Sequence, residues 1–356
     1  MNARYWLNRF WMIGLSTMLI VFGIGCSSSA TPSPTPKATE HETTTTAFSN
    51  VPGILDPQNF GWPRSVKGSN GSITIPEKPQ RIITASIGHD EMTLALVPAS
   101  RLVGVGSVTQ DSTYSNVANL TKDIPIINTD PEILIAQQPD VMVVSPYMPQ
   151  ETIEALNKLN VPIIQTSLSN NPTTRIQDIL LLGYIYGEEE RAIEFAKEVE
   201  VRYKSLTNIT RHKDFNDERK RTMAVTRYSD QIWTAGIDSA EGSIIEMAGG
   251  INVAANAGIV GNATTSLEGL IAMDPEVIFI PQPIDWGANE LKTDLLNNPA
   301  LKNVAAIKAN QVHIVESRIF TTLSFWNIKG AESLASILWP SEFTNEILPS
   351  FTLPPN

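Results

Sequence analysis

The chain has 356 residues, of which 42% are hydrophobic and 18% charged, a balance that suits a globular protein long enough for two domains of ordinary size. Its formal net charge of −11, with no basic stretch to offset it, argues against nucleic acid as a partner. One cysteine and four histidines exclude an internal disulfide framework and a cysteine-based zinc site.

The first 26 residues have the layout of a secretory signal. Arg4 and Arg9 precede an uncharged run from residue 10 to residue 25, and Cys26 follows directly. The run is shorter than the roughly 20 residues that a membrane span needs. It resembles a bacterial lipoprotein signal, which would make Cys26 the lipid attachment site. The Gly-Ile-Gly-Cys box lacks a large aliphatic residue three positions before the cysteine, so a retained anchor helix stays open as an alternative. Both interpretations place the remainder outside the cytoplasm and tie it to a membrane.

The segment after Cys26 and the first half of the chain differ sharply in composition. Residues 27–60, rich in Ser, Thr and Pro, predict an extended tether. From residue 61 to residue 187, short apolar runs alternate with helical patterns, which predicts an N-terminal lobe with a parallel sheet covered on both faces. The expected strands are 72–76, 81–86, 102–106, 124–127, 140–145 and 161–166, and the expected helices are 88–96, 131–137, 150–159 and 175–186.

A long amphipathic helix is predicted over residues 188–210. Gly187 marks a break before it, and the acidic run Glu188–Glu190 suits the positive end of a helix dipole. At 1.5 Å per residue the helix would span about 30 Å, enough to bridge two small domains. Its apolar side chains recur at steps of three and four, at Ala192, Phe195, Ala196, Val199, Tyr203 and Leu206.

Residues 211–345 predict a second lobe, and residues 346–356 a tail without a strong pattern. The expected strands are 222–226, 231–235, 277–280 and 311–315. The expected helices are 242–248, 266–273, 290–296, 301–307 and 324–338, the last closed by Pro340.

The two lobes share a sequence unit. Residues 131–144 and 267–280 both read Glu, two residues, Ile-Ala, two residues, Pro, an acid and four apolar residues. Each unit predicts a short helix, a proline turn and a buried strand. A second copy 136 positions later favours two lobes of one architecture, with Glu132 and Glu268 at equivalent places.

Signatures of common enzymes are absent from the sequence. It has no GxxxxGK[ST], no GxGxxG after a strand, no GxSxG and no HExxH. His212 and His313 are interpreted as ordinary surface or core residues. His89 follows the predicted strand 81–86, where open α/β sheets place ligand contacts, and is a candidate for one.

Several segments, in this order and spacing, resemble the periplasmic binding proteins of ABC importers for iron–siderophores, haem and cobalamin. They are 78–86 (KPQRIITAS), Glu91 with 94–96, 101–105 (RLVGV), the two repeated units, 243–252 (SIIEMAGGIN) and 298–301 (NPAL). The resemblance covers residues 70 to 340, roughly. It implies two Rossmann-like lobes joined by one long helix, with the ligand in the cleft between them. It also implies delivery to a membrane permease driven by a cytoplasmic ATPase.

The family docks on its permease through one surface glutamate in each lobe, and the matching positions here are Glu132 and Glu268. Two carboxylates at a fixed separation would give register and charge complementarity with a basic partner. Glu91 is also typical of the family and is interpreted as structural.

The cleft should be lined by loops at the carboxyl ends of strands. Aromatic side chains there would give flat apolar contact, and arginines would pair with carboxylates, catecholates or propionates. The predicted ligand-binding residues are His89, Tyr147, Arg227, Tyr228, Trp233, Trp286 and Arg318. Phe320 and Trp326 are further aromatic candidates, and Trp326 is the weaker one because it falls within a helix pattern.

The ligand is expected to be a metal chelate and not a bare ion, because a metal site would need several converging His, Asp or Glu. We rank a ferric siderophore first, cobalamin second and haem third, and expect no resident cofactor and a monomeric protein. The expected function is that of a lipid-anchored binding protein, not an enzyme. An extracytoplasmic enzyme on the same scaffold and a ligand-sensing lipoprotein without a permease stay open as alternatives.

Overall fold

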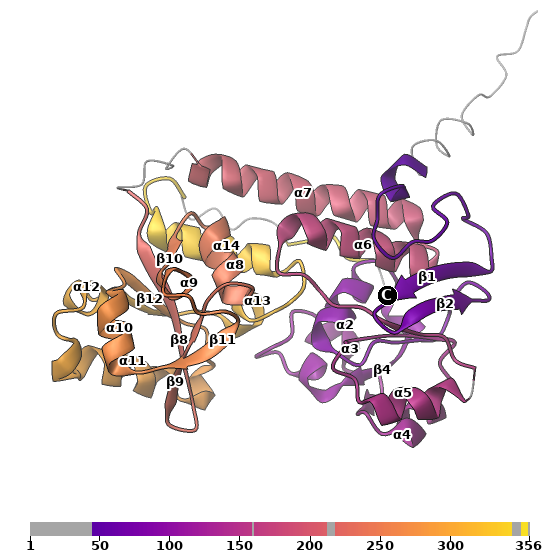
Figure 1. Cartoon of the computed structure of the whole chain (residues 1–356), viewed down its shortest axis with the longest axis horizontal. Coiled ribbons are helices and arrows are strands. Elements are labelled where there is room, and N and C mark those ends of the chain that lie inside the picture. Colours follow the sequence, from indigo (N-terminus) through magenta and orange to yellow (C-terminus); the bar gives the residue numbers. More distant parts are fainter. Residues whose placement is uncertain (1–44, 159, 212–217, 344–349, 355–356) are drawn as a thin grey trace, which may run out of the picture.

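The computed structural model describes residues 45–158, 160–211, 218–343 and 350–354, and it shows two α/β lobes joined by one long helix (Figure 1). The predicted fold class is therefore confirmed. No helix within these ranges is both long enough and apolar enough to cross a membrane.

The N-lobe is built on five parallel strands in the order β5-β4-β3-β6-β7. The strands are β3 (Ile82–Ile83), β4 (Leu102–Gly106), β5 (Ile126–Ile127), β6 (Val141–Val144) and β7 (Ile163–Gln165). The helices are α2 (Ile87–Leu94), α3 (Ala118–Thr121), α4 (Pro131–Ala136), α5 (Gln150–Asn157) and α6 (Pro172–Tyr186). All four residues of β6 are buried, as expected for a central parallel strand covered on both faces. The antiparallel hairpin of β1 (Arg64–Gly68) and β2 (Gly71–Ile75) adjoins the β7 edge, where Asn70 Nδ2 donates to the Ile163 carbonyl at 2.8 Å.

The C-lobe sheet has six strands, with β11-β9-β8-β12-β13 in line and β10 beside β8. They are β8 (Arg221–Tyr228), β9 (Gln231–Ala235), β10 (Ile251–Asn252), β11 (Asn262–Thr265), β12 (Val277–Ile280) and β13 (Val312–Ile314). The helices are α8 (Ala240–Met247), α9 (Val253–Asn256), α10 (Leu267–Met273), α11 (Ala288–Asn297), α12 (Ala305–Lys308), α13 (Ser317–Phe320) and α14 (Asn327–Leu338).

The C-lobe sheet is mixed and not wholly parallel. Strands β8, β10, β12 and β13 run parallel, whereas β9 and β11 are antiparallel to their neighbours. The cause is the turn between β8 and β9, where Ser229 and Asp230 both have positive φ (48° and 64°). A two-residue turn of this kind can only form a hairpin, because a parallel connection needs a crossover of a dozen or more residues.

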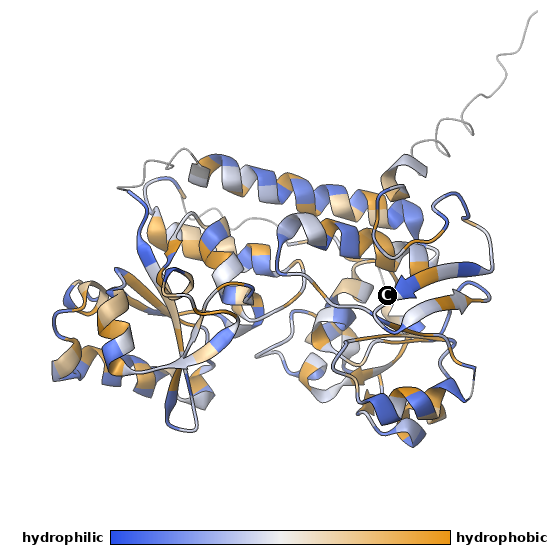
Figure 2. Ribbon diagram, in the orientation of Figure 1, coloured by the Kyte–Doolittle hydropathy of each residue, from blue (hydrophilic) through white to orange (hydrophobic). Residues whose placement is uncertain are grey.

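The long helix α7 (Glu189–Arg211) spans both lobes along one side of the molecule (Figure 1). Its predicted apolar stripe is confirmed: Ala192, Phe195 and Val199 are fully buried, and hydrophilic residues alternate with hydrophobic ones along the helix in Figure 2. Gly187 ends α6 in the left-handed region at φ 69°, which lets the chain turn directly into α7.

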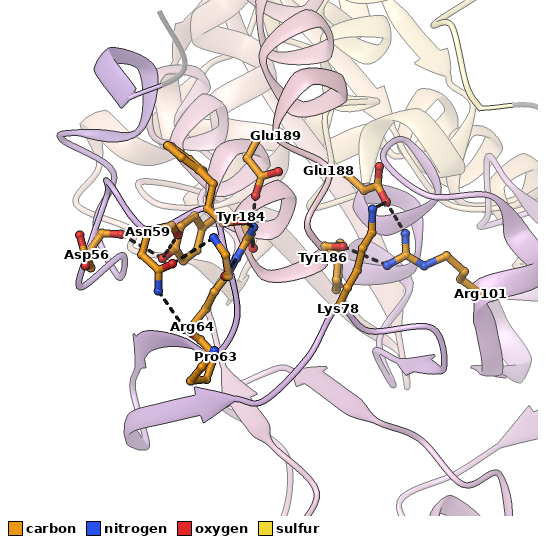
Figure 3. Close-up of polar contacts among 12 residues, drawn as sticks. Asp56, Asn59, Pro63, Arg64, Lys78, Arg101, Tyr184, Tyr186, Glu188 and Glu189 are labelled. Atoms are coloured by element: carbon orange, nitrogen blue, oxygen red, sulfur yellow. Dashed lines mark hydrogen bonds and ion pairs between the residues drawn. The ribbon is translucent and has the colours of Figure 1, made fainter. Parts of the chain in front are cut away.

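Ion pairs fix the start of α7 to the N-lobe (Figure 3). The Arg64 guanidinium, 2% exposed, pairs with Glu189 and lies over the Tyr184 ring, 4.8 Å from its centroid. Arg101 and Lys78 both pair with Glu188, the latter at 2.9 Å. The helix therefore moves with the N-lobe at this end.

The predicted tether is too long at its carboxyl end. Phe48 and Val51 are buried, and the Phe48 ring lies 5.8 Å from Phe60 and 6.2 Å from Tyr184. The Tyr184 hydroxyl donates to the carbonyl of Asp56. Residues from about 45 onward thus belong to the N-lobe; Cys26 lies outside the described residues.

The expected patternless tail also has a packed part. Phe351 is 4% exposed, with its ring centroid 5.9 Å from Phe195 of α7 and 4.8 Å from Phe325. Arg191 donates to the Thr352 carbonyl, and Glu198 accepts from the Thr352 N–H at 3.1 Å. Residues 350–354 therefore pack along α7.

Candidate ligand-binding cleft

The two lobes face each other through the carboxyl ends of their parallel strands. In the N-lobe, β4 leads to Tyr114 and β6 leads to Tyr147, and in the C-lobe β12 leads to Trp286. The Tyr114 and Trp286 rings meet edge to face, with centroids 5.3 Å apart and an interplanar angle of 68°. This contact joins segments far apart in the sequence and brings the carboxyl edges of the two sheets together, and we take the candidate ligand-binding cleft to lie between these edges.

Tyr228 lies on the same side of the cleft as Trp286. The pKa of Tyr114 is raised to about 12, first by burial and then by the neighbouring Tyr228 and Asp111. Burial and the charge of Glu241 raise the pKa of Tyr228 as well. Tyr114 was not singled out from sequence because only its partner in the other lobe identifies it.

Trp233 shares a face of the C-lobe sheet with Tyr228. It stands opposite Thr226 in the β8–β9 register, and Thr226 and Tyr228 point the same way because strand side chains alternate. Its indole N–H is buried with no hydrogen-bond partner among the described residues, and the same holds for the Tyr114 hydroxyl. Each is a polar group that a ligand in the cleft would be able to satisfy.

Arg227 does not face the cleft, although the sequence predicts a ligand contact for it. Because it precedes Tyr228 on β8, it points to the opposite face. There it pairs with Asp294 of α11 at 2.7 Å and lines an outer groove with Leu267 and Pro299. The sequence-based assignment fails because two adjacent strand residues cannot line the same face.

His89 is also not free to contact a ligand. The ring is 2% exposed, its Nδ1 lies 2.7 Å from the Ser86 hydroxyl, and its Nε2 lies 2.9 Å from the Thr166 hydroxyl. Burial lowers the pKa of His89 to about 4, so the imidazole is neutral at physiological pH. Ser86 caps α2 and turns His89 inward, which gives the ring a structural place in the N-lobe.

The remaining predicted contacts stay accessible. Tyr147 is 94% exposed, Trp286 59% and Tyr228 44%. Arg318 follows β13 and forms an ion pair with Glu316, with its side chain 40% exposed. Phe320 and Trp326, the further aromatic candidates, are core residues.

Glu91 links the lobes beneath this cleft. Its Oε1 accepts from the backbone N–H and side-chain amide of Asn116 at 2.9 and 2.8 Å, and its Oε2 accepts from Thr322 at 2.6 Å and from Ser324. The Asn116 amide also donates to the Arg318 carbonyl at 2.8 Å. Burial raises the pKa of Glu91. Glu91 therefore bridges the N-lobe and the segment after β13, which is a structural role.

A second contact between the lobes lies nearer α7. The Ser243 hydroxyl donates to the Asn170 carbonyl at 2.6 Å, and the Asn170 amide donates to the Asp238 carbonyl at 3.0 Å. A cavity of about 370 Å³ adjoins these residues between α6, α7 and α8. It is lined by residues of these helices and by the loop 236–239 after β9, and none of the predicted ligand contacts lines it.

Glu132 and Glu268 occupy equivalent places on the two lobes. Both are exposed in the first turn of a short helix, α4 or α10, and Asp130 and Ser266 cap these helices. Hydrogen bonds from its own backbone N–H and from Ser266 lower the pKa of Glu268, which keeps it ionised. No group of three or more His, Cys, Asp or Glu that could hold a metal ion exists in the described part of the chain.

Comparisons with known proteins agree with this architecture. The chain is 25% identical over 272 residues to the molybdate-binding protein MolA of Haemophilus influenzae, covering 68% of this chain and 74% of that protein. It is 22% identical over 278 residues to YvrC of Bacillus subtilis, an uncharacterised ABC transporter substrate-binding lipoprotein, covering 77% of this chain and 85% of that one. The names of both relatives describe binding proteins.

Solved structures share the fold. Molybdate-bound MolA superposes with a TM-score of 0.67 at 23% identity, covering 80% of this chain and 94% of that one. The apo haem-binding protein RhuT from Roseiflexus sp. RS-1 gives 0.63 at 22% identity, covering 73% and 98%. The family model described as periplasmic binding protein matches residues 82–318, and the chain belongs to this family.

Proposed function

We propose that the protein is the lipid-anchored, extracytoplasmic substrate-binding component of an ABC importer and that it captures a ferric siderophore for delivery to a membrane permease. The observation that carries the ligand assignment is the contact of Tyr114 with Trp286 across the cleft. Support comes from Tyr228, which lies near enough to Tyr114 to raise its pKa, and from the accessible ring of Tyr147 after β6 and the Arg318 side chain after β13.

These side chains suit a bulky, partly anionic organic complex. Aromatic rings give flat apolar contact, and an arginine pairs with carboxylate or catecholate oxygens. The enclosed Tyr114 hydroxyl and Trp233 N–H add two polar groups on opposite sides of the cleft. A small oxyanion such as the molybdate of one relative would need a closed polar pocket, whereas Trp286 is 59% exposed here. Cobalamin and haem, which also combine flat apolar surface with acidic groups, are the alternatives.

The test is tryptophan fluorescence of the protein titrated with a ferric hydroxamate, a ferric catecholate, ferric citrate, haem, cobalamin and molybdate. We expect saturable quenching by a ferric siderophore at submicromolar concentration. Trp286→Phe should remove much of the signal, and the buried core residue Trp326→Phe is the matched control that retains it. Saturation by haem, cobalamin or molybdate alone would overturn the siderophore assignment. Failure to bind any of these ligands, from folded protein, would favour a sensor or an enzyme.

Delivery to the permease is assigned to Glu132 and Glu268. Reversing both charges with Glu132→Lys and Glu268→Lys should abolish uptake and leave ligand binding intact, because both exposed glutamates are separate from the residues assigned to the ligand. Unchanged uptake would refute docking through these residues.

Lipid attachment is assigned to Cys26, and Cys26→Ser should release the protein from membranes. If the variant stays membrane-bound, a retained anchor helix is the better account.

A further inference from the structure

The helices that carry Glu132 and Glu268 expose the same set of side chains. In both, the glutamate is followed three and four positions later by an exposed isoleucine and an exposed alanine, which share its helix face. The sets are Glu132, Ile135 and Ala136 in α4, and Glu268, Ile271 and Ala272 in α10.

The isoleucines are exposed although the residue before each is buried. Leu134 and Leu270 are both 0% exposed, so the two helices pack on their lobes with the same side inward. Ile135 is 36% exposed and Ile271 41%. Neither helix contains a lysine or arginine, so each face combines one negative charge with aliphatic surface.

We propose that each lobe docks on the permease through a glutamate–isoleucine pair, in which the carboxylate meets a basic side chain and the isoleucine packs on apolar surface beside it. This inference rests on the proposed docking function of Glu132 and Glu268. An exposed ion pair alone contributes little affinity, whereas burial of an aliphatic side chain adds a favourable term that salt does not screen. Helices α4 and α10 lie on different lobes, both away from α7 (Figure 1). The partner must therefore offer two such surfaces, as the paired membrane subunits of an importer would.

The test measures ATPase stimulation of the cognate permease–ATPase complex in lipid nanodiscs, titrated with the full-length protein. Ile135→Ser and Ile271→Ser should each raise the half-saturating concentration about tenfold, and Ile135→Val should restore most of the affinity. The matched control is Ile209→Ser, which truncates an isoleucine of similar exposure (39%) on α7 and should behave as the unaltered protein. Equal unfolding midpoints exclude a folding defect.

The glutamate variants separate the two proposals. If Glu132→Lys and Glu268→Lys abolish stimulation while the serine variants match Ile209→Ser, the isoleucine contacts are refuted and docking through the glutamates stands. If neither the glutamate nor the isoleucine variants change stimulation, the docking assignment falls and this inference falls with it. A tenfold loss in the serine variants at both low and high salt supports the apolar contact.

Discussion

Replacing Phe351 with alanine should test whether the C-terminal segment stabilises the fold. The ring is 4% exposed and meets Phe195, Phe325 and Trp326 at centroid distances of 5.9, 4.8 and 5.2 Å. The Arg202 guanidinium lies 4.6 Å from its centroid on another side. Truncating a buried phenylalanine costs about 3–5 kcal/mol in a closed core. Residues 350–354 belong to no helix or strand and can detach from α7 instead of enclosing a cavity, so we expect a loss of about 3 kcal/mol.

The assay is urea unfolding followed by far-UV circular dichroism, with the free energy of unfolding compared between variants. Phe351→Leu keeps most of the volume and should lose only about 1 kcal/mol. A chain ending at residue 349 should lose at least as much as Phe351→Ala, because it also lacks the Thr352 contacts with Arg191 and Glu198. A loss below about 1 kcal/mol in both Phe351→Ala and the shortened chain would refute the reasoning.

Three further changes test the N-lobe. Arg64→Met leaves the Glu189 carboxylate, which is 15% exposed, without its cation, and should lower the free energy of unfolding in urea by about 3–5 kcal/mol. The double variant Arg64→Met with Glu189→Met should recover part of this loss. Equal free energies of unfolding in the single and double variants would refute the pairing. The folded pKa of His89 is about 4 and its ordinary value 6.5, so the unfolded state binds more protons between these values and stability falls by about 2 kcal/mol from pH 7 to pH 5. His89→Gln should lack this part of the acid loss; an unchanged pH dependence would contradict it. Gly183→Ala would place a Cβ 2.2 Å from that of Ala192, so α6 and α7 must separate at a cost of about 1–3 kcal/mol, and an unchanged unfolding midpoint would show that the helices pack less tightly.

Much of the fold could be predicted because its signals are local. The apolar stripe of α7 needs only the period of an α-helix, and the repeated unit needs only comparison of the chain with itself. The packing of Phe48 and Phe351 could not be predicted, because one aromatic residue outside any helix or strand pattern has no periodicity. Its burial depends on partners such as Tyr184 and Phe195 that lie far along the chain.

The sequence could predict which loops form the candidate site, but it could not predict which side chains in those loops are accessible. The rule that ligands meet the carboxyl ends of strands selects the segments that hold Tyr114 and Trp286, which meet between the lobes. Alternation on β8 would have separated Arg227 from Tyr228 once the strand was extended to residue 228. The enclosure of His89 by Ser86 and Thr166 and the pairing of Tyr114 with Trp286 are tertiary contacts, which no local pattern encodes.

The attachment of the N-terminal segment at Phe48 has a mechanical consequence. Any tension transmitted along the chain from its N-terminal side enters at Phe48 and is distributed to Phe60 and Tyr184, all within the N-lobe. From there it reaches Arg64 and the fixed end of α7. The C-lobe, joined to the N-lobe through α7 and the contacts beneath the cleft, lies off this force path. Pulling on the N-terminal segment therefore displaces the whole body without prying the two lobes apart.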